Sequence, residues 1–476
     1  MEMIGTTEDP IALAAKGTPL ARTDIGFAER FAFQHKDKAL YQPDAKIWYV
    51  WDGKRWRPDE SLVLMRELGI RTARSIMQEV FAMPTDANNH DKENHFKFAL
   101  RSEAREKINA GICLAASLGM SQPLEILDAN PMLFNCKNGT VDLRTGELRS
   151  HNIADFITKI SPVEFSPALV DPIFERFVVH ITGEDPELAS YLQRAAGYSL
   201  TGLTSEKCMM IVYSEKTDTG KSSFVEGLLA VAGDYGISLD IETFLDQKNG
   251  HNAARYDLAK LRGVRVAASS ENNPGREFSD DVIKRLTGGD TVRAREIHQS
   301  SIQFAPTHKL WLCTNYSPAP TDGGDAATWN RLRRVPFNNQ IPLDQRDPAV
   351  KRALENPHSD ACKAFLSWAV AGVVSWNKSS LGSCAAVDAS TSEYKTESQP
   401  LGDFIEDCCN IGPENTVNSA AIYDAYLSWC KAQSNKFTFS RQRVGRQLSL
   451  QGFEKCRTSS GAKAWKGLSL KNDPMQ

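Results

Sequence analysis

A glycine, a lysine and a serine in succession give the strongest chemical signal in this sequence. Gly220, Lys221 and Ser222 end a polar loop in the segment MMIVYSEKTDTGKSSFVEGLLAVAG, which begins with an apolar run. Backbone N–H groups of such a loop surround a polyphosphate, the lysine reaches the β- and γ-phosphates, and the serine hydroxyl ligates Mg²⁺. We therefore expect ATP and Mg²⁺ to bind the loop residues, which are Thr217, Asp218, Thr219, Gly220, Lys221, Ser222 and Ser223.

One position departs from the usual pattern of a phosphate-binding loop. The pattern GxxxxGK[ST] begins with glycine, whereas this chain has Glu215 there. A GKS triplet alone also occurs in incidental turns, so the apolar run before it and the helical segment after it carry the interpretation. We expect Glu215 to alter nucleotide affinity.

Two further apolar segments end in polar side chains that suit the same chemistry. GVRVAASSEN ends near Glu271, and HKLWLCTN ends in Asn315. A carboxylate at a strand end can hold the Mg²⁺ shell or orient water, and an amide can hydrogen-bond the γ-phosphate. A surface glutamate is the alternative for Glu271. The later segment WNRLRRVPF offers three arginines for a charge placed on a neighbour's nucleotide, namely Arg331, Arg333 and Arg334.

The elements that position these residues are predicted to form an α/β fold. Each polar group follows an apolar segment of strand length, the first being residues 209–213. Residues 222–231 are predicted to be helical. A second helix is predicted from Asp185, an N-cap followed by proline, to Leu200. We place an ATPase domain at residues 176–378.

The flanking regions are predicted to be smaller domains. Residues 1–25 are expected to be a flexible arm, and 26–175 a mixed, largely helical domain with helices at 61–83 and 92–119. Its hairpins are expected at Asp52-Gly53, as a two-residue turn, and within 135–149. Residues 379–400 have the small polar composition of a linker.

The tail, residues 401–476, is predicted to be a winged-helix-like domain with two helices and a terminal hairpin. Its basic residues indicate DNA contact, although a charge run is often only a solvated face. They are Lys436, Arg441, Arg443, Arg446, Lys455, Arg457, Lys463, Lys466 and Lys471.

Composition excludes several classes of protein. A chain of 476 residues with 41% hydrophobic and 24% charged residues is globular and divides into domains. The net charge of -3 argues against passive coating of DNA. Its ten cysteines form no CxxC pair typical of structural zinc. No apolar stretch of membrane-spanning length or signal peptide is found, so we expect a cytoplasmic protein without a membrane partner.

In this order the motifs resemble the superfamily 3 helicases, and among them the phage, plasmid and poxvirus primase–helicase family. The similarity extends over roughly residues 26 to 470, and the front third resembles that family's N-terminal region. It implies an AAA+ P-loop ATPase, the helicase half without a primase domain. The carrying segments are GKSSF at 220–224, VAASSEN at 266–272, IKRLTGGDTVRAR at 283–295, FAPTHKLWLCTNYSP at 304–318 and WNRLRRVPF at 329–337.

The resemblance implies roles for individual residues. Lys221 and Ser222 would bind nucleotide and Mg²⁺, Glu271 would be the Walker B acid, Asn315 sensor 1, and Arg331 the arginine finger. Because no second carboxylate adjoins Glu271, its role as metal ligand or base stays open. A hairpin would grip DNA through Arg293, Arg295, His298 and Gln299.

The function so implied is a hexameric, ATP-dependent replicative helicase on single-stranded or forked DNA. We expect it to be encoded by a phage, prophage or plasmid in a bacterial cell, and to work beside a separate primase or polymerase. The first alternative is an ATP-dependent factor that melts an origin or loads other proteins without processive unwinding. The second is a DNA-binding replication factor that has lost turnover.

Overall fold

The computed structural model describes residues 8–85, 89–244, 258–271, 277–295, 301–321, 325–398, 400–433, 438–458 and 461–471. The chain divides into two compact units. The first comprises Met1–Asn130, Lys137–Thr140 and Arg149–Ile160. The second comprises Pro131–Cys136, Val141–Leu148 and Ser161–Gln476.

The first unit is largely helical, with a small antiparallel sheet. Its helices are α1 (Pro10–Ala15), α2 (Asp24–His35), α3 (Val63–Ala82), α4 (Asn89–Ser102) and α5 (Arg105–Ala115). Its sheet, in the order β1-β2-β3, contains β1 (Ala39–Gln42), β2 (Ile47–Trp51) and β3 (Trp56–Pro58). The helical segment predicted at 92–119 is therefore divided, since α4 ends at Ser102 and α5 begins at Arg105.

A buried ionic cluster joins three of these helices. Arg30 of α2 donates from Nε and Nη2 to the two carboxylate oxygens of Glu79 in α3, each at 2.7 Å. His95 of α4 lies 3.1 Å from Glu79 Oε2. All three side chains are at most 1% exposed. Because a buried charge needs partners in hydrogen-bond contact, this cluster fixes the helices to one another.

Two sequence expectations for this unit need correction. Within the segment expected to be a flexible arm, residues 10–15 form α1, because the Asp9 carboxylate accepts the Ile11 N–H and Pro10 begins the helix. The Asp52-Gly53 hairpin is present, but Trp51 pairs with Trp56 across a four-residue turn. The turn is longer than two residues because Asp52 Oδ1 accepts the N–H groups two and three residues later, at 2.9 Å each.

A three-stranded sheet follows in the order β4-β5-β6. Its strands are β4 (Leu133–Cys136), β5 (Gly139–Asp142) and β6 (Glu147–Arg149). These strands confirm the hairpins expected between residues 135 and 149.

The centre of the second unit is a five-stranded parallel sheet in the order β15-β7-β13-β9-β8. Its strands are β7 (Met209–Tyr213), β8 (Gly236–Ser238), β9 (Val266–Glu271), β13 (Lys309–Thr314) and β15 (Leu332–Pro336). Short pairs flank it: β10 (Glu277–Phe278) with β14 (Ala319–Pro320), and β11 (Val292–Arg295) with β12 (Ser301–Phe304).

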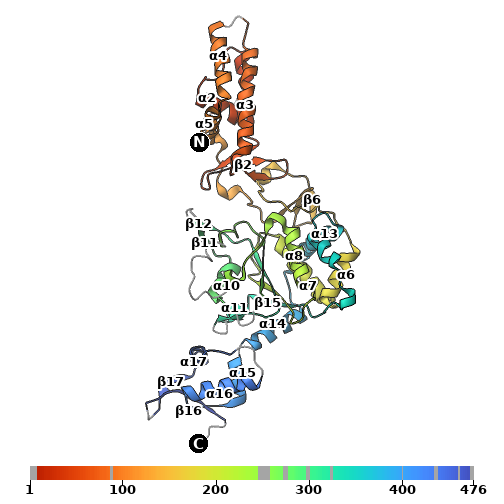
Figure 1. Cartoon of the computed structure of the whole chain (residues 1–476), viewed down its shortest axis with the longest axis vertical. Helices are drawn as coiled ribbons and strands as arrows, with labels where there is room; N and C mark the ends of the chain where they lie inside the picture. Colours follow the sequence, from red (N-terminus) through yellow and green to blue (C-terminus); the bar gives the residue numbers. More distant parts are fainter. Residues whose placement is uncertain are drawn as a thin grey trace. The chain divides into compact units, whose positions relative to one another are not determined.

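Alternate residues of this sheet belong to separate cores on its two faces. In β7, Met210 and Val212 pack into one apolar cluster, and Met209 and Ile211 into the other. Helices gather on the first face (Figure 1), as α6 (Pro172–Thr182), α7 (Pro186–Leu200), α8 (Lys221–Ala232) and α13 (Asp360–Ser379). The second face packs against α10 (Asp280–Thr287) and α11 (Ala326–Trp329). The expected helix from Pro186 to Leu200 is confirmed, with Asp185 as its cap.

The segment expected to be a linker contains a packed helix. Residues Ala385–Glu397 form α14, whose Tyr394 is 1% exposed and meets Trp329 edge to face. Arg334 of β15, fully buried, donates to Ser390, Glu393 and Glu397 of this helix. The expectation of a linker was wrong because it depended on the small polar composition of the segment. Only a few side chains of this helix enter the core, so most of its residues are small and polar although the helix is packed.

The C-terminal part has its own apolar cluster, which includes Phe404, Tyr426 and Trp465. Its antiparallel sheet has the order β16-β18-β17, with β16 (Cys409–Asn418), β17 (Glu454–Arg457) and β18 (Lys463–Leu470). Its helices are α15 (Pro400–Cys408), α16 (Ser419–Ala432) and α17 (Arg441–Leu450). Helix α12 (Pro348–Glu355) lies earlier in the chain and packs into the first-face core through Leu354. The two helices and the terminal hairpin confirm the sequence reading, whereas β16 was not predicted.

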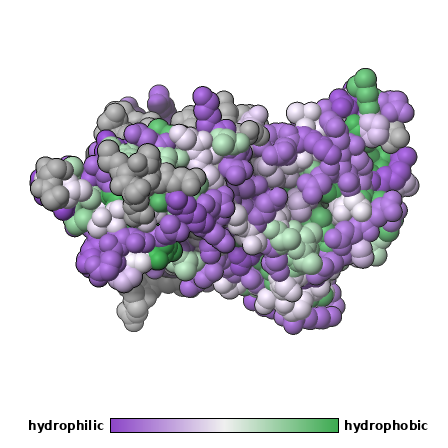
Figure 2. All heavy atoms as spheres, turned by 90° about the horizontal axis from the view of Figure 1, so that it is seen from below, coloured by the Kyte–Doolittle hydropathy of each residue, from purple (hydrophilic) through white to green (hydrophobic). Residues whose placement is uncertain are grey.

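The face drawn in Figure 2 is mostly hydrophilic. On the face shown in Figure 2, hydrophobic residues form small separate groups among polar ones. Among the described residues, none of the helices has the length and apolar character needed to cross a membrane.

Candidate nucleotide-binding site

Three sequence-predicted positions meet at one edge of the parallel sheet. Thr314, at the end of β13, lies opposite Tyr213 of β7 on one side and Glu271 of β9 on the other. The loop that follows β7 and the residue that follows β13 therefore leave the sheet together. Ligands of open parallel sheets bind in the crevice outside these carboxyl ends.

The loop between β7 and α8 has a backbone that only particular residues adopt. Gly220 has φ +85°, and a Cβ there would lie 2.6 Å from Ile181 and 3.1 Å from Phe177. Asp218 also has a positive φ, of 56°. Glycine is thus required at 220 both by its conformation and by the close approach of α6. The loop then passes directly into α8 at Lys221, so the first N–H groups of the helix face the crevice.

Lys221 is held inside this loop. Its Nζ donates to the backbone carbonyl oxygens of Lys216 at 2.8 Å and Ser214 at 3.3 Å, and to the hydroxyl of Thr219 at 3.3 Å. The residue is 6% exposed, and burial lowers the pKa of its ammonium group. These acceptors are neutral, so the cation is positioned by the loop without a carboxylate hydrogen bond. Such a cation attracts an anion that enters the crevice.

Asn315 reaches the same loop from β13. Its Nδ2 donates to the carbonyl oxygen of Lys216 at 3.2 Å and lies 3.5 Å from that of Glu215. The amide therefore lies beside Lys221, as its position at the strand end led us to expect. Glu271 shares the edge through its backbone register, and its side chain lies outside what the structure describes.

Ser222 and Ser223 follow Lys221 in the first turn of α8, and neither is buried. Ser222 is exposed, and its Oγ lies 3.7 Å from the Sγ of Cys313 in β13. A hydroxyl at this position suits a Mg²⁺ ion that also contacts phosphate oxygens, because Mg²⁺ prefers few protein ligands and keeps several waters. Among the described residues, His, Cys, Asp and Glu side chains form no metal-binding group of three or more.

A cavity of about 680 Å³ adjoins the loop. Its walls come from Asp218 and Gly220 of the loop, from α6, and from α12 with the segment that leads into it. Arg346 of that segment pairs with Asp218 at 2.8 Å, and the Ile341 N–H donates to the Asp218 carbonyl at 2.9 Å. Other lining residues are Arg176, Phe177, His180, Ser223 and Lys351. Sequence reasoning had included Ser223 with the loop and missed the other lining residues, because no motif links them to the loop.

The three arginines of WNRLRRVPF lie in different environments. The Arg331 carbonyl accepts the Met209 N–H at 2.7 Å, which places Arg331 at the amino end of β7. It is therefore at the sheet edge opposite the loop and is not brought together with Lys221. Arg333 is half-buried and donates to the carbonyls of Asn330 and Leu332. Arg334 is buried against α14, so the expectation that it could serve a neighbour's nucleotide is wrong.

The expected DNA-binding hairpin is described in part. Strands β11 and β12 pair antiparallel, and Arg293 lies opposite Gln303, both exposed. Arg295 ends β11 opposite Ser301. His298 and Gln299 lie outside the described residues.

Family comparisons match two regions of the chain. Residues 27–183 match a family described as "D5 N terminal like". Residues 212–334 match a family of unknown function, DUF5906, which spans the loop, Glu271, Asn315 and Arg331.

Curated relatives include proteins named as helicases. "Putative helicase L207/L206" of Acanthamoeba polyphaga mimivirus is 23% identical over 86% of this chain and 45% of its own length. "Putative helicase 022R" of Frog virus 3 is 22% identical over 67% of this chain and 40% of its own length. "Putative helicase 184R" of Invertebrate iridescent virus 6 is 23% identical over 87% and 50%. The chain thus spans half or less of the length of these relatives. They belong to a mimivirus, a frog virus and an invertebrate iridescent virus, whereas we expected the chain itself to come from a bacterial phage, prophage or plasmid.

A solved structure titled "The A form apo structure of NrS-1 C terminal region-CTR" has a TM-score of 0.45 and 8% identity to this chain. The likeness covers 90% of this chain and 96% of that one.

Proposed function

Because the chain belongs to the D5-like primase–helicase family, we propose that it is an ATP-dependent DNA helicase of superfamily 3. One observation supports this proposal most. Lys221 Nζ and Asn315 Nδ2 meet at one carbonyl oxygen, at the edge of a parallel sheet and within the loop whose Asp218 and Gly220 line a cavity of about 680 Å³.

In the proposed reaction, the loop holds the triphosphate of ATP. Backbone N–H groups at the start of α8 and the Lys221 ammonium group bind phosphate oxygens, and Asn315 hydrogen-bonds the γ-phosphate or the attacking water. Mg²⁺, when bound through Ser222, would neutralise charge on the β- and γ-phosphates. Glu271 is proposed as the acid that orients either the metal shell or the water.

Arg331 is proposed to act on the nucleotide of a neighbouring subunit. Its place at the opposite sheet edge supports this, because β7 has five residues and a strand rises about 3.3 Å per residue. An arginine roughly 15 Å or more along the sheet from its own phosphate-binding loop needs a second subunit to contribute to hydrolysis. A ring of subunits, as in the proposed hexamer, provides that arrangement.

The proposed DNA contact is the hairpin of β11 and β12. Arg293 is exposed beside Gln303, and β12 is followed in the chain by β13, which ends at Asn315. A change at the γ-phosphate can therefore be passed along one strand to the hairpin. His298 and Gln299 remain proposed tip residues, and a separate primase or polymerase a proposed partner.

The test is ATP turnover by the purified chain with and without single-stranded DNA, followed by unwinding of a forked duplex. DNA-stimulated turnover together with unwinding is the expected result. Turnover without unwinding would replace the proposal with a factor that melts an origin or loads other proteins. No turnover in either condition would leave a DNA-binding replication factor and would overturn the enzymatic assignment.

A further inference from the structure

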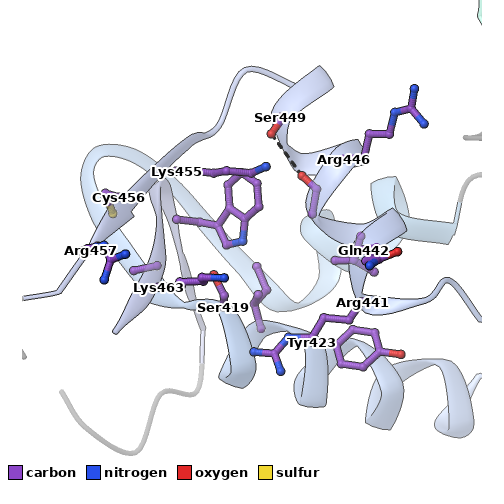
Figure 3. A pocket seen from close by; sticks show the side chains of 15 residues that line it. Ser419, Tyr423, Arg441, Gln442, Arg446, Ser449, Lys455, Cys456, Arg457 and Lys463 are labelled. Atoms are coloured by element: carbon purple, nitrogen blue, oxygen red, sulfur yellow. Dashed lines mark hydrogen bonds between the residues drawn. The ribbon is translucent and has the colours of Figure 1, made fainter. Parts of the chain in front are cut away.

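The C-terminal part contains a second cavity, of about 960 Å³, away from the phosphate-binding loop in the sequence. Figure 3 shows that it opens between helix α17, the start of α16 and the hairpin of β17 and β18. Five of its lining residues are cations, from α17 on one side and from the hairpin on the other: Arg441, Arg446, Lys455, Arg457 and Lys463. Among the described residues, no aspartate or glutamate lines it.

These cations are only partly compensated. Within the described part of the chain, no carboxylate forms an ion pair with Arg441, Lys455, Arg457 or Lys463. Arg457 donates to the neutral carbonyl of Gly461 at 3.1 Å, and Lys455 lies 5.5 Å from the centre of the Trp465 ring. Their charges thus face a concave space rather than protein anions.

Two pairs of charged residues lie opposite each other in this hairpin, one pair of like charges and one of opposite charges. Arg457 lies directly opposite Lys463, whereas Glu454 lies directly opposite Lys466. Like charges placed opposite each other destabilise a strand pair, and opposite charges stabilise it. The cavity-lining pair is therefore the unfavourable one in the absence of a ligand. An anion between Arg457 and Lys463 would turn this repulsion into attraction.

The cavity favours phosphate groups over bases. Trp465, the large ring in its wall, is 4% exposed, so its face is closed to stacking by a base. A Cβ at Gly445 of α17 would lie 3.3 Å from this ring, so the helix passes close above it. The charged groups in its lining are all cationic, and they bind phosphate oxygens without reading a base sequence, beside the half-buried Tyr423 ring and the exposed Gln442 amide.

We infer that this cavity binds the phosphodiester backbone of DNA, without sequence preference, between α17 and the β17–β18 hairpin. The inference rests on the proposed function for the identity of the polyanion. It adds a DNA site separate from the β11–β12 hairpin, which would keep the chain on DNA independently of its nucleotide state.

The test uses the full chain without nucleotide and labelled DNA of mixed sequence, as a single strand and as a duplex, over a salt titration. The variant carries Arg457→Gln and Lys463→Gln. The matched control carries Lys431→Gln and Lys378→Gln, which remove the same charge from exposed positions outside the cavity. Because each phosphate contact contributes roughly 0.9 to the salt slope for duplex and 0.7 for single strands, loss of two contacts lowers the slope by about 1.8 or about 1.4.

A lower affinity and slope in the cavity variant, but not in the control, is expected, and the form of DNA that loses more identifies the one bound there. Equal slopes in variant, control and wild type would overturn the inference. Thermal unfolding checks folding, and Arg441→Gln with Lys455→Gln gives a second variant from other walls if the first fails to fold. ATP turnover is measured in parallel, so loss of the proposed ATPase activity and loss of this DNA site are separate results.

Discussion

Lys221 and Asn315 donate to the same acceptor, the backbone carbonyl oxygen of Lys216, at 2.8 Å and 3.2 Å. One residue begins α8 and the other follows β13, so the shared acceptor couples the helix to the sheet. A phosphate that draws the Lys221 ammonium group toward itself would change the hydrogen bonds available to Asn315. The shared acceptor therefore offers a physical connection between the crevice and the end of β13.

Lys221→Ala is expected to lower ATP turnover by roughly 100-fold or more, because the loop loses the buried cation aimed at the transferred phosphate. Lys216→Ala, at an exposed position in the same loop, is the control and should keep most of the activity. Steady-state hydrolysis measures both. Turnover of Lys221→Ala within about tenfold of wild type would remove the phosphate-binding assignment.

Asn315→Ala is expected to reduce turnover more than nucleotide affinity, since its amide would act on the γ-phosphate or water while most binding comes from the loop. Single-turnover hydrolysis and equilibrium binding of a nucleotide separate the two quantities. Asn377→Ala is a suitable control, because that amide donates to the carbonyl of Leu143, outside the cavity beside the loop. Equal losses of affinity and turnover would show that Asn315 only stabilises the conformation of the loop.

The sequence carried enough information to place the strands and polar groups of this site, but not the residues around it. Met209–Tyr213 and the helix from Lys221 follow from local patterns, and parallel pairing then brings Asn315 to the loop. The partner of Asp218 is Arg346, more than a hundred residues later, and no local pattern specifies that pair. The same limit applies to α14, which is fixed by Arg334 from a distant strand.

The charges around Arg334 make a prediction about stability. Glu393→Gln with Glu397→Gln is expected to lower the free energy of unfolding by about 1–3 kcal/mol, because the fully buried guanidinium group loses both carboxylates. The expected loss is kept small because the two carboxylates are partly exposed and solvent screens their charges. Arg334→Met should cost less, since Tyr213 and Tyr394 can pack on the thioether. Calorimetry of both variants, with Glu355→Gln in a surface pair as control, tests this order. A more stable double glutamine variant would contradict it.

The buried Glu79 leads us to expect that the first unit loses stability in acid. Burial favours the neutral carboxyl group, but hydrogen bonds from His95 and Arg30, with their charges, outweigh it and lower the pKa of Glu79 below 4.5. A carboxylate with a lowered pKa in the folded state contributes stability above pH 4.5, and that contribution is lost as the pH falls through the folded value. The midpoint temperature of thermal unfolding of this unit should therefore decrease as the pH is lowered below 4.5.

The control is Glu79→Leu with Arg30→Met and His95→Phe, in which no titrating group of this cluster remains. Its unfolding free energy should depend less on pH in the same window, by up to about 1.4 kcal/mol per pH unit for one proton. An unchanged dependence would show that other carboxylates cause the acid sensitivity.

Arg331→Ala should retain nucleotide binding and lose hydrolysis by roughly a thousandfold, the scale of arginine fingers. Its backbone lies at the sheet edge opposite Lys221, so any contribution must come from a neighbouring subunit. When variant and wild-type subunits are mixed at a fixed total concentration, activity should therefore fall more steeply than the variant's share. Arg333→Ala, two residues later, is the control, because its guanidinium group donates to the carbonyls of Asn330 and Leu332 in its own chain; mixtures with this variant should keep the wild-type activity. A proportional loss with Arg331→Ala would mean that each subunit hydrolyses ATP without this arginine from its neighbour, and the proposed ring mechanism would lose its contact between subunits.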